Sequence, residues 1–126
     1  MRADQPVYSN TAADRRYLCG ITGTGASNPT SRYGNGITPT RTAQGVYRFS
    51  FASHPGYLKA VDASFGADTP SAVKGYSFSR GLYVAPSGST NGYVEISVWD
   101  ASNNAVDLAA LQYMDVELSF SELSTG

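Results

Sequence analysis

The sequence predicts an all-β protein: an antiparallel β-sandwich or jelly roll of about seven to nine short strands, preceded by an extended N-terminal arm. Three observations predict this class. Short runs alternate apolar and polar residues with period two, clusters of Gly, Pro, Ser and Asn separate these runs, and no segment has a convincing helical period. The 126 residues have room for one compact domain, which we expect to span residues 17–126.

The N-terminal arm is predicted over residues 1–16, which are polar, include Pro6 and show neither helical nor strand periodicity. Residues 17–22 then form a short strand, and the Gly-, Ser- and Asn-rich residues 23–36 are typical of a loop. Residues 45–51 give the clearest strand of the whole sequence, with three aromatic side chains on one face. After a turn that contains His54, residues 57–65 form the next strand.

The second half continues the same pattern. Strands over residues 73–80 and 81–85 are separated or bulged at the glycine between them. Residues 92–100 alternate cleanly, with valine and isoleucine pointing inward. Residues 105–111 have some helical propensity, but a short strand or a single turn crossing between sheets is favoured. The last predicted strand covers residues 113–123.

Composition excludes several classes of partner and chemistry. Nine basic and ten acidic residues give a net charge of −1, so we expect no nucleic-acid partner. A single cysteine, Cys19, and a single histidine, His54, leave no disulfide, zinc cluster or redox pair, and no cofactor or metal is expected. No apolar stretch has the length of a secretion signal core or a membrane span, which predicts a protein made in the cytosol with no membrane partner.

No residue pattern indicates an enzyme. A nucleophile elbow and a phosphate-binding loop are both missing from the sequence, and His54 is best explained as a solvated turn residue. Asp115 and Glu117 alternate on the outward face of a strand, as expected of a solvated surface rather than a catalytic pair. Oxygen-bearing residues at 100–104 are typical of a hairpin turn and lack the spacing of a calcium loop. We therefore predict no catalytic residues.

Aromatic and arginine residues are the candidates for contact with a partner. Seven of the nine basic residues are arginine, which suits desolvated interfaces better than lysine. Exposed aromatic rings could stack on sugars or fill a protein interface, and the candidates are Tyr33, Tyr83, Tyr93 and Trp99. The favoured interpretation is that they occupy the half-buried rim of the sandwich, with their hydroxyls reaching water or backbone. The residues predicted to form a protein interface are Arg2, Tyr8, Arg15, Arg16, Tyr33 and Trp99.

The sequence from residue 45 onward resembles the small β proteins that decorate or cement the capsids of tailed bacteriophages. The resemblance consists of a Gly-x-Tyr-x-Phe-x-Phe strand at residues 45–51, an Ala-Asp-Thr turn at 67–69, the strand at 93–99, the Asp-Ala-Ser turn that follows it, and Ala-Val-Asp-Leu-Ala-Ala before the last strand. It covers about two thirds of the chain. C1q-like and tumour-necrosis-factor-like jelly rolls share a strand of the first type, and the N-terminal region has no counterpart in the phage family.

The resemblance implies a non-enzymatic protein, commonly trimeric, that bridges neighbouring subunits of the major capsid protein on the outer surface of the virion. Its expected partners are the major capsid protein and two further copies of itself, and its expected place of synthesis is the host cytoplasm. The alternative is a carbohydrate- or receptor-binding module that uses exposed tyrosine and tryptophan side chains. A secreted C1q-like signalling head is disfavoured because the sequence begins without a secretion signal.

Overall fold

The computed structural model describes residues 14–34, 36–52 and 57–121. Within these ranges the chain forms eight strands and one short 3-10 helix, η2. The strands are β1 (Asp14–Thr22), β2 (Thr30–Tyr33), β3 (Ile37–Ala43), β4 (Val46–Phe51), β5 (Tyr57–Ala67), β6 (Ser77–Val84), β7 (Gly92–Trp99) and β8 (Gln112–Ser121), and η2 is Pro70–Val73. Every strand pair is antiparallel. Because the described residues contain eight strands and no α-helix, the predicted all-β class is confirmed.

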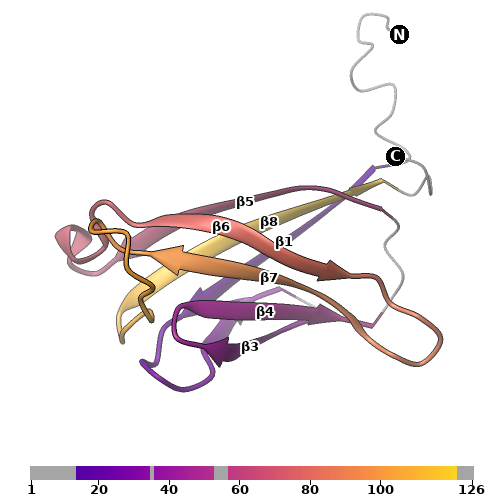
Figure 1. Cartoon of the computed structure of the whole chain (residues 1–126), viewed down its shortest axis with the longest axis horizontal. Coiled ribbons are helices and arrows are strands. Elements are labelled where there is room, and N and C mark those ends of the chain that lie inside the picture. Colours follow the sequence, from indigo (N-terminus) through magenta and orange to yellow (C-terminus); the bar gives the residue numbers. More distant parts are fainter. Residues whose placement is uncertain (1–13, 35, 53–56, 122–126) are drawn as a thin grey trace, which may run out of the picture.

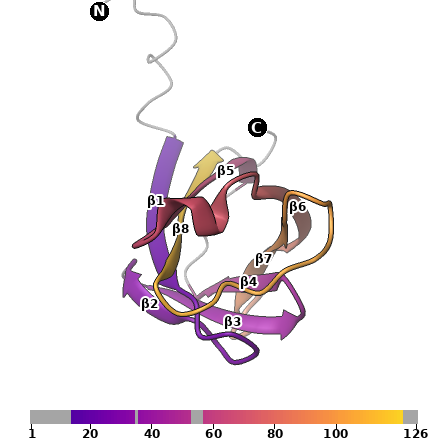
Figure 2. The same ribbon diagram turned by 90° about the vertical axis from the view of Figure 1, so that its left-hand side faces the viewer.

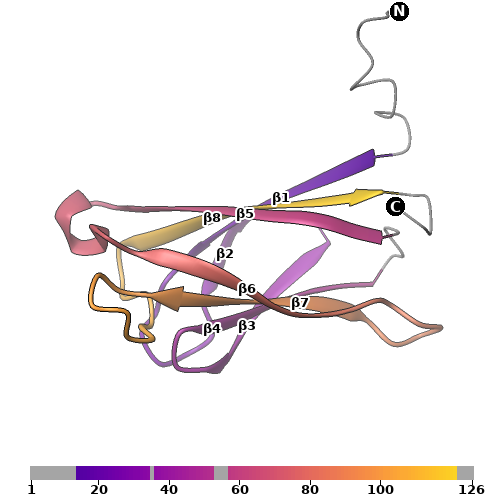
Figure 3. The same cartoon turned by 45° about the horizontal axis from the view of Figure 1, so that its top comes forward.

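Two four-stranded sheets pack face to face as a sandwich (Figure 1). The first sheet has the order β2-β1-β8-β5, and the second has the order β3-β4-β7-β6. Figure 3 shows them as separate layers, with η2 linking β5 of the first sheet to β6 of the second at one end. The pair β4–β7 of the second sheet is nested in sequence inside the pair β1–β8 of the first, as occurs in jelly-roll sandwiches.

Alternating side chains of the central strands form the core between the sheets. Strands β4 and β7 alternate strictly between half-buried and buried residues, as does most of β8. The buried hydrophobic residues that they contribute are Tyr47, Phe49, Phe51, Val94, Ile96, Val98, Met114, Val116, Leu118 and Phe120. The inward faces predicted for these strands are confirmed, and burial of their apolar surface is the main stabilising contribution to the fold.

Several predicted strand boundaries are wrong. Strand β1 begins at Asp14, so residues 14–16 belong to the sheet rather than to the arm. Residues 30–33, predicted as loop, pair with β1 as strand β2. Val73 ends η2 and is not the first residue of a strand. The register shift between Arg80 and Tyr83 confirms the bulge predicted near residue 81.

The connection from β7 to β8 crosses from the second sheet to the first. It contains one isolated bridge, between Trp99 and Ala105, and no regular strand within residues 105–111. The expected crossing between sheets is confirmed, whereas the short strand is not. Figure 2 shows this connection at the same end of the sandwich as η2. The predicted turn around His54 lies outside the described residues.

All four edge strands carry features that hinder pairing with another strand. Strand β2 has only four residues, and Pro39 in β3 has no N–H to donate. Bulges interrupt the pairing of β5 near Leu58 and of β6 near Arg80, and the Asp62 carboxylate accepts the backbone N–H of Ala63 in β5. We therefore expect partners to contact the faces of the sandwich and not its edges.

Candidate functional site

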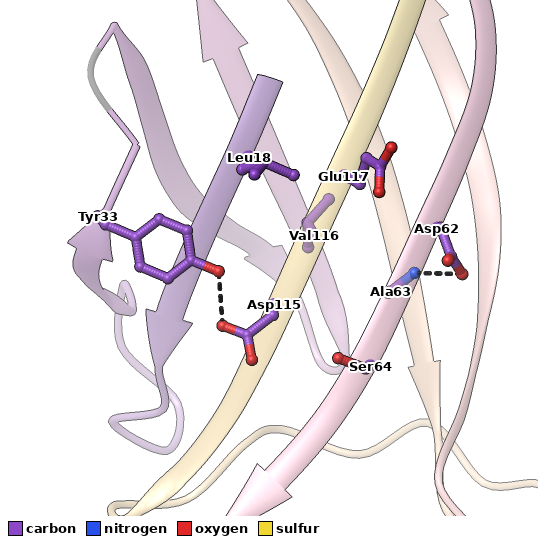
Figure 4. A pocket seen from close by; sticks show the side chains of 8 residues that line it. All are labelled: Leu18, Tyr33, Asp62, Ala63, Ser64, Asp115, Val116 and Glu117. Carbon is purple, nitrogen blue, oxygen red and sulfur yellow. Dashed lines mark hydrogen bonds between the residues drawn. The ribbon is translucent and has the colours of Figure 1, made fainter. Parts of the chain in front are cut away.

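The outer face of the first sheet carries an open hollow of about 140 Å³ (Figure 4). The period-two alternation of the strands points Leu18 of β1 and Asp115 and Glu117 of β8 away from the core. The hollow is lined by Leu18, Tyr33, Asp62, Ala63, Ser64, Asp115, Val116 and Glu117. Leu18 is 56% exposed, which is unusual for a leucine in the middle of a long strand and marks this face as a candidate contact surface.

Tyr33 closes one side of the hollow because Gly20 leaves room for its ring. A Cβ atom on Gly20 would lie 2.3 Å from Cε2 of Tyr33, so the ring occupies the space that any other residue would fill. The Tyr33 hydroxyl donates a hydrogen bond of 2.8 Å to Oδ1 of Asp115. Partial burial and this hydrogen bond raise the pKa of Tyr33, so its hydroxyl remains a neutral donor at pH 7.

Two arginines are paired with carboxylates on the same face. Nη1 of Arg32 lies 3.0 Å from Oδ1 of Asp115, and its guanidinium carbon lies 4.8 Å from the ring centroid of Tyr113. Nε of Arg16 lies 3.1 Å from Oε2 of Glu117.

Two further carboxylates lie on the same side of the first sheet. The Tyr113 hydroxyl donates to Asp68, which raises the pKa of Tyr113. Asp62 accepts the backbone N–H of Ala63 and has no ion pair within the described residues. The four carboxylates named here, Asp62, Asp68, Asp115 and Glu117, therefore outnumber the guanidinium groups of Arg16 and Arg32.

The outer face of the second sheet is neutralised by its own contacts. The guanidinium carbon of Arg48 lies 3.8 Å from the ring centroid of Tyr93, and Nη2 of Arg48 lies 2.7 Å from Oε2 of Glu95. The indole Nε1–H of Trp99 donates to Oγ of Ser79 at 3.0 Å. Because these charged and polar groups are hydrogen-bonded or paired with one another, the outer face of the second sheet offers fewer unpaired charges to a partner than that of the first.

The four aromatic candidates for sugar stacking do not share one face. Tyr33 lies on the first sheet, and Tyr93 and Trp99 lie on the outer face of the second. Tyr83 points toward the core, where its ring centroid is 6.4 Å from that of Phe51 and 6.2 Å from that of Phe120. These residues therefore form no common aromatic platform.

The predicted interface residues are likewise distributed over different surfaces. Arg16 and Tyr33 lie on the outer face of the first sheet, whereas Arg15 alternates to the other side of β1. Trp99 lies on the second sheet. Arg2 and Tyr8 lie outside the described residues.

The sequence prediction missed Leu18, Asp62, Asp115 and Glu117 as a group. The sequence predicts that Asp115 and Glu117 point outward, but only as solvated side chains. The period-two alternation of Leu18 with the buried Cys19 was the available signal that Leu18 points outward.

Cys19 lies on the inward side of β1, is 3% exposed and is expected to be unreactive. Burial, together with the negative charge of Asp115, raises the pKa of its thiol to about 12. At pH 8 only about one thiol in ten thousand would be ionised, and the thiolate is the reactive form. Folded protein should therefore not react with Ellman's reagent at pH 8 over an hour, while protein unfolded in guanidinium should react at once. Rapid release of one equivalent from the folded protein would contradict this assignment.

No group of three metal-binding side chains that could hold an ion occurs in residues 14–34, 36–52 and 57–121, so the carboxylates of the hollow do not form a metal cluster. In the same part of the chain, no helix is long and apolar enough to cross a membrane. Comparison with protein-family models, with curated proteins and with solved structures finds no match. The fold defines the class of this protein, a two-sheet antiparallel β-sandwich.

Proposed function

We propose that this chain is a non-enzymatic structural protein that decorates and stabilises a bacteriophage capsid by bridging neighbouring major capsid subunits, as a homotrimer. The observation that supports this function best is the outer face of the first sheet, where Leu18 and Tyr33 are exposed beside paired arginines and carboxylates. Tyrosine and arginine are enriched in protein interfaces. Because bulges interrupt the edge strands β5 and β6, docking through a face of a sheet is favoured over pairing at an edge.

The mechanism is stabilisation by linkage. A protein that binds the intact shell across subunits, and not the separated subunits, raises the free energy needed to open the shell. A trimer strengthens the effect because the second and third contacts form at a high effective concentration. The predicted arm leads directly into β1, a strand of the proposed docking face, so arm and face would reach the same partner. In this role the protein acts on the outer surface of the virion after synthesis in the host cytoplasm.

The direct test uses the full chain and shells assembled from the major capsid protein of the same genome. Light scattering behind a sizing column should give the mass of three chains. The chain should sediment with the shells to a fixed stoichiometry and raise their melting temperature. Failure to bind the shells would overturn the proposed function, and a monomer that nevertheless binds them would overturn only the trimer.

Removal of residues 2–13 should weaken shell binding at least about tenfold and leave the sandwich folded, because this deletion stops before β1. Sedimentation with shells and thermal unfolding of the free protein measure the two effects. Deletion of residues 2–16 is the comparison: it also removes three residue pairs with β8 and the Arg16–Glu117 ion pair, so it should lower the melting temperature. Unchanged shell binding after the shorter deletion would show that the arm makes no contact with the partner.

A further inference from the structure

The hollow on the first sheet has the size of a long side chain. Its volume of about 140 Å³ exceeds the roughly 30 Å³ that one water molecule occupies in the liquid, so it can accept a group of several heavy atoms. One wall is largely apolar, because Leu18 is 56% exposed and Tyr33 is 43% exposed. Figure 4 shows Leu18 and Tyr33 on one side of β8 and Asp62 on the other, with the side chains of Asp115 and Ser64 between them.

The charges around the hollow favour a cation. Three of its eight lining residues carry carboxylates, and the two nearby guanidinium groups each contact a single one of them: Arg32 contacts Asp115, and Arg16 contacts Glu117. The third carboxylate, Asp62, has a backbone N–H as its hydrogen-bond donor and no ion pair within the described residues. The Ser64 hydroxyl adds a further polar group beside these carboxylates.

No three His, Cys, Asp or Glu side chains in the described part of the chain come close enough to share a metal ion. A lysine or arginine side chain matches the arrangement better. Its aliphatic stem can cover the apolar wall while its charged head, which carries several N–H donors, reaches separate carboxylates. The apolar wall and the excess of negative charge thus match the two halves of one side chain.

We propose that this hollow receives a lysine or arginine side chain from the protein to which the outer face of the first sheet docks. The stem lies against Leu18 and Tyr33, and the cationic head binds Asp62 together with Glu117 or Asp115. The inference rests on the proposed function and deepens it, since it assigns to the major capsid protein a basic side chain at the contact.

The test is a titration of the isotope-labelled full chain with a capped hexapeptide that carries two arginines. The backbone amide signals of residues 18, 33, 62–64 and 115–117 should shift, and addition of salt should reverse the shifts. A matched hexapeptide with glutamates in place of the arginines should leave these signals unchanged. Shifts confined to other residues, or equal shifts with both peptides, would overturn the inference.

Asp62→Asn and Asp62→Lys provide the decisive variants because Asp62 is exposed and its removal breaks no ion pair within the described residues. The dissociation constant of the arginine peptide should rise about fivefold to tenfold in the first variant and further in the second. Glu95→Gln makes the same charge change on the outer face of the second sheet and should have no effect on peptide binding. Equal affinity of the wild type and both Asp62 variants would contradict the proposal.

Shell binding separates this inference from the proposed function. If the wild type and Asp62→Lys bind shells equally, the hollow is not the contact and the inference is wrong, while the proposed function stands. If the wild type binds no shells, the proposed function is wrong, as is the assignment of the side chain to a capsid subunit. If Asp62→Lys disrupts the free trimer instead, the occupant belongs to a second copy of this chain, and the assignment to a capsid partner is overturned.

Discussion

Replacement of Phe120 by alanine should lower the free energy of unfolding by about 3–5 kcal/mol. Phe120 is fully buried in β8, and its ring joins the two sheets. Its centroid lies 5.4 Å from that of Tyr17 in the first sheet and 5.6 Å from that of Phe51 in the second. Alanine would leave a cavity between layers that the surrounding strands cannot close without breaking their register.

Urea unfolding followed by circular dichroism measures this loss. Phe120→Leu is the matched control: it retains an apolar side chain of similar reach and should cost about 1–2 kcal/mol. Since small domains have a total stability of about 5–15 kcal/mol, the alanine variant should unfold at a clearly lower urea concentration. A loss below about 1 kcal/mol in Phe120→Ala would show that this ring does not hold the sheets together.

The central strands could be predicted from the sequence, whereas the edge strands β2 and β3 could not. Strands β7 and β8 bury every second side chain, so their period of two is visible in the residue types. Strands β2 and β3 consist mainly of Thr, Ser and Arg with one proline, and of these residues only Ile37 is buried. Their strand conformation follows from pairing with β1 and β4, a tertiary effect that local propensity does not encode.

The candidate site shows the same division. The outward direction of Asp115 and Glu117 follows from alternation along β8 alone. The contacts of Asp115 with Arg32 and Tyr33 join residues 83 and 82 positions apart, and they depend on β1 separating β2 from β8 by one strand. No local sequence pattern determines which strands are neighbours in the sheet. The hollow could therefore not be predicted, although most of its residues belong to correctly predicted strands.

Asp107 binds the β7–β8 connection to the second sheet through hydrogen bonds. Replacement of Asp107 by alanine should therefore also lower the stability of the protein strongly. Its carboxylate accepts two hydrogen bonds from Arg41 of β3, Nε to Oδ1 at 2.8 Å and Nη2 to Oδ2 at 3.0 Å. Oδ1 also accepts the backbone N–H of Gly45 at 2.8 Å. The next residue, Leu108, donates its backbone N–H to the hydroxyl of the buried Tyr47 at 2.7 Å.

Asp107→Ala would leave the Arg41 guanidinium without this carboxylate and the Gly45 N–H without its acceptor. We expect the melting temperature at pH 7 to fall by about 5–10 °C. The lower part of this range allows for solvent screening, because the Arg41 and Asp107 side chains are still about one fifth exposed. Glu95→Ala is the control, because Glu95 accepts two hydrogen bonds from Arg48 on the same sheet and, within the described residues, none from a backbone N–H. Its effect on the melting temperature should be smaller.

The dependence on pH distinguishes the charge of Asp107 from its packing. The Arg41 guanidinium, helped by the Gly45 N–H, holds the pKa of Asp107 below its ordinary value of 3.8. The stabilisation is therefore complete above about pH 5, where the carboxyl is ionised in both the folded and unfolded chain, and is lost as pH falls through the unfolded value and then the lower folded value. The difference in melting temperature between the wild type and Asp107→Ala should be constant from pH 5 to 8 and should shrink below about pH 4. A difference that persists unchanged to pH 2 would mean that packing of this side chain, and not its ion pair, holds the connection in place.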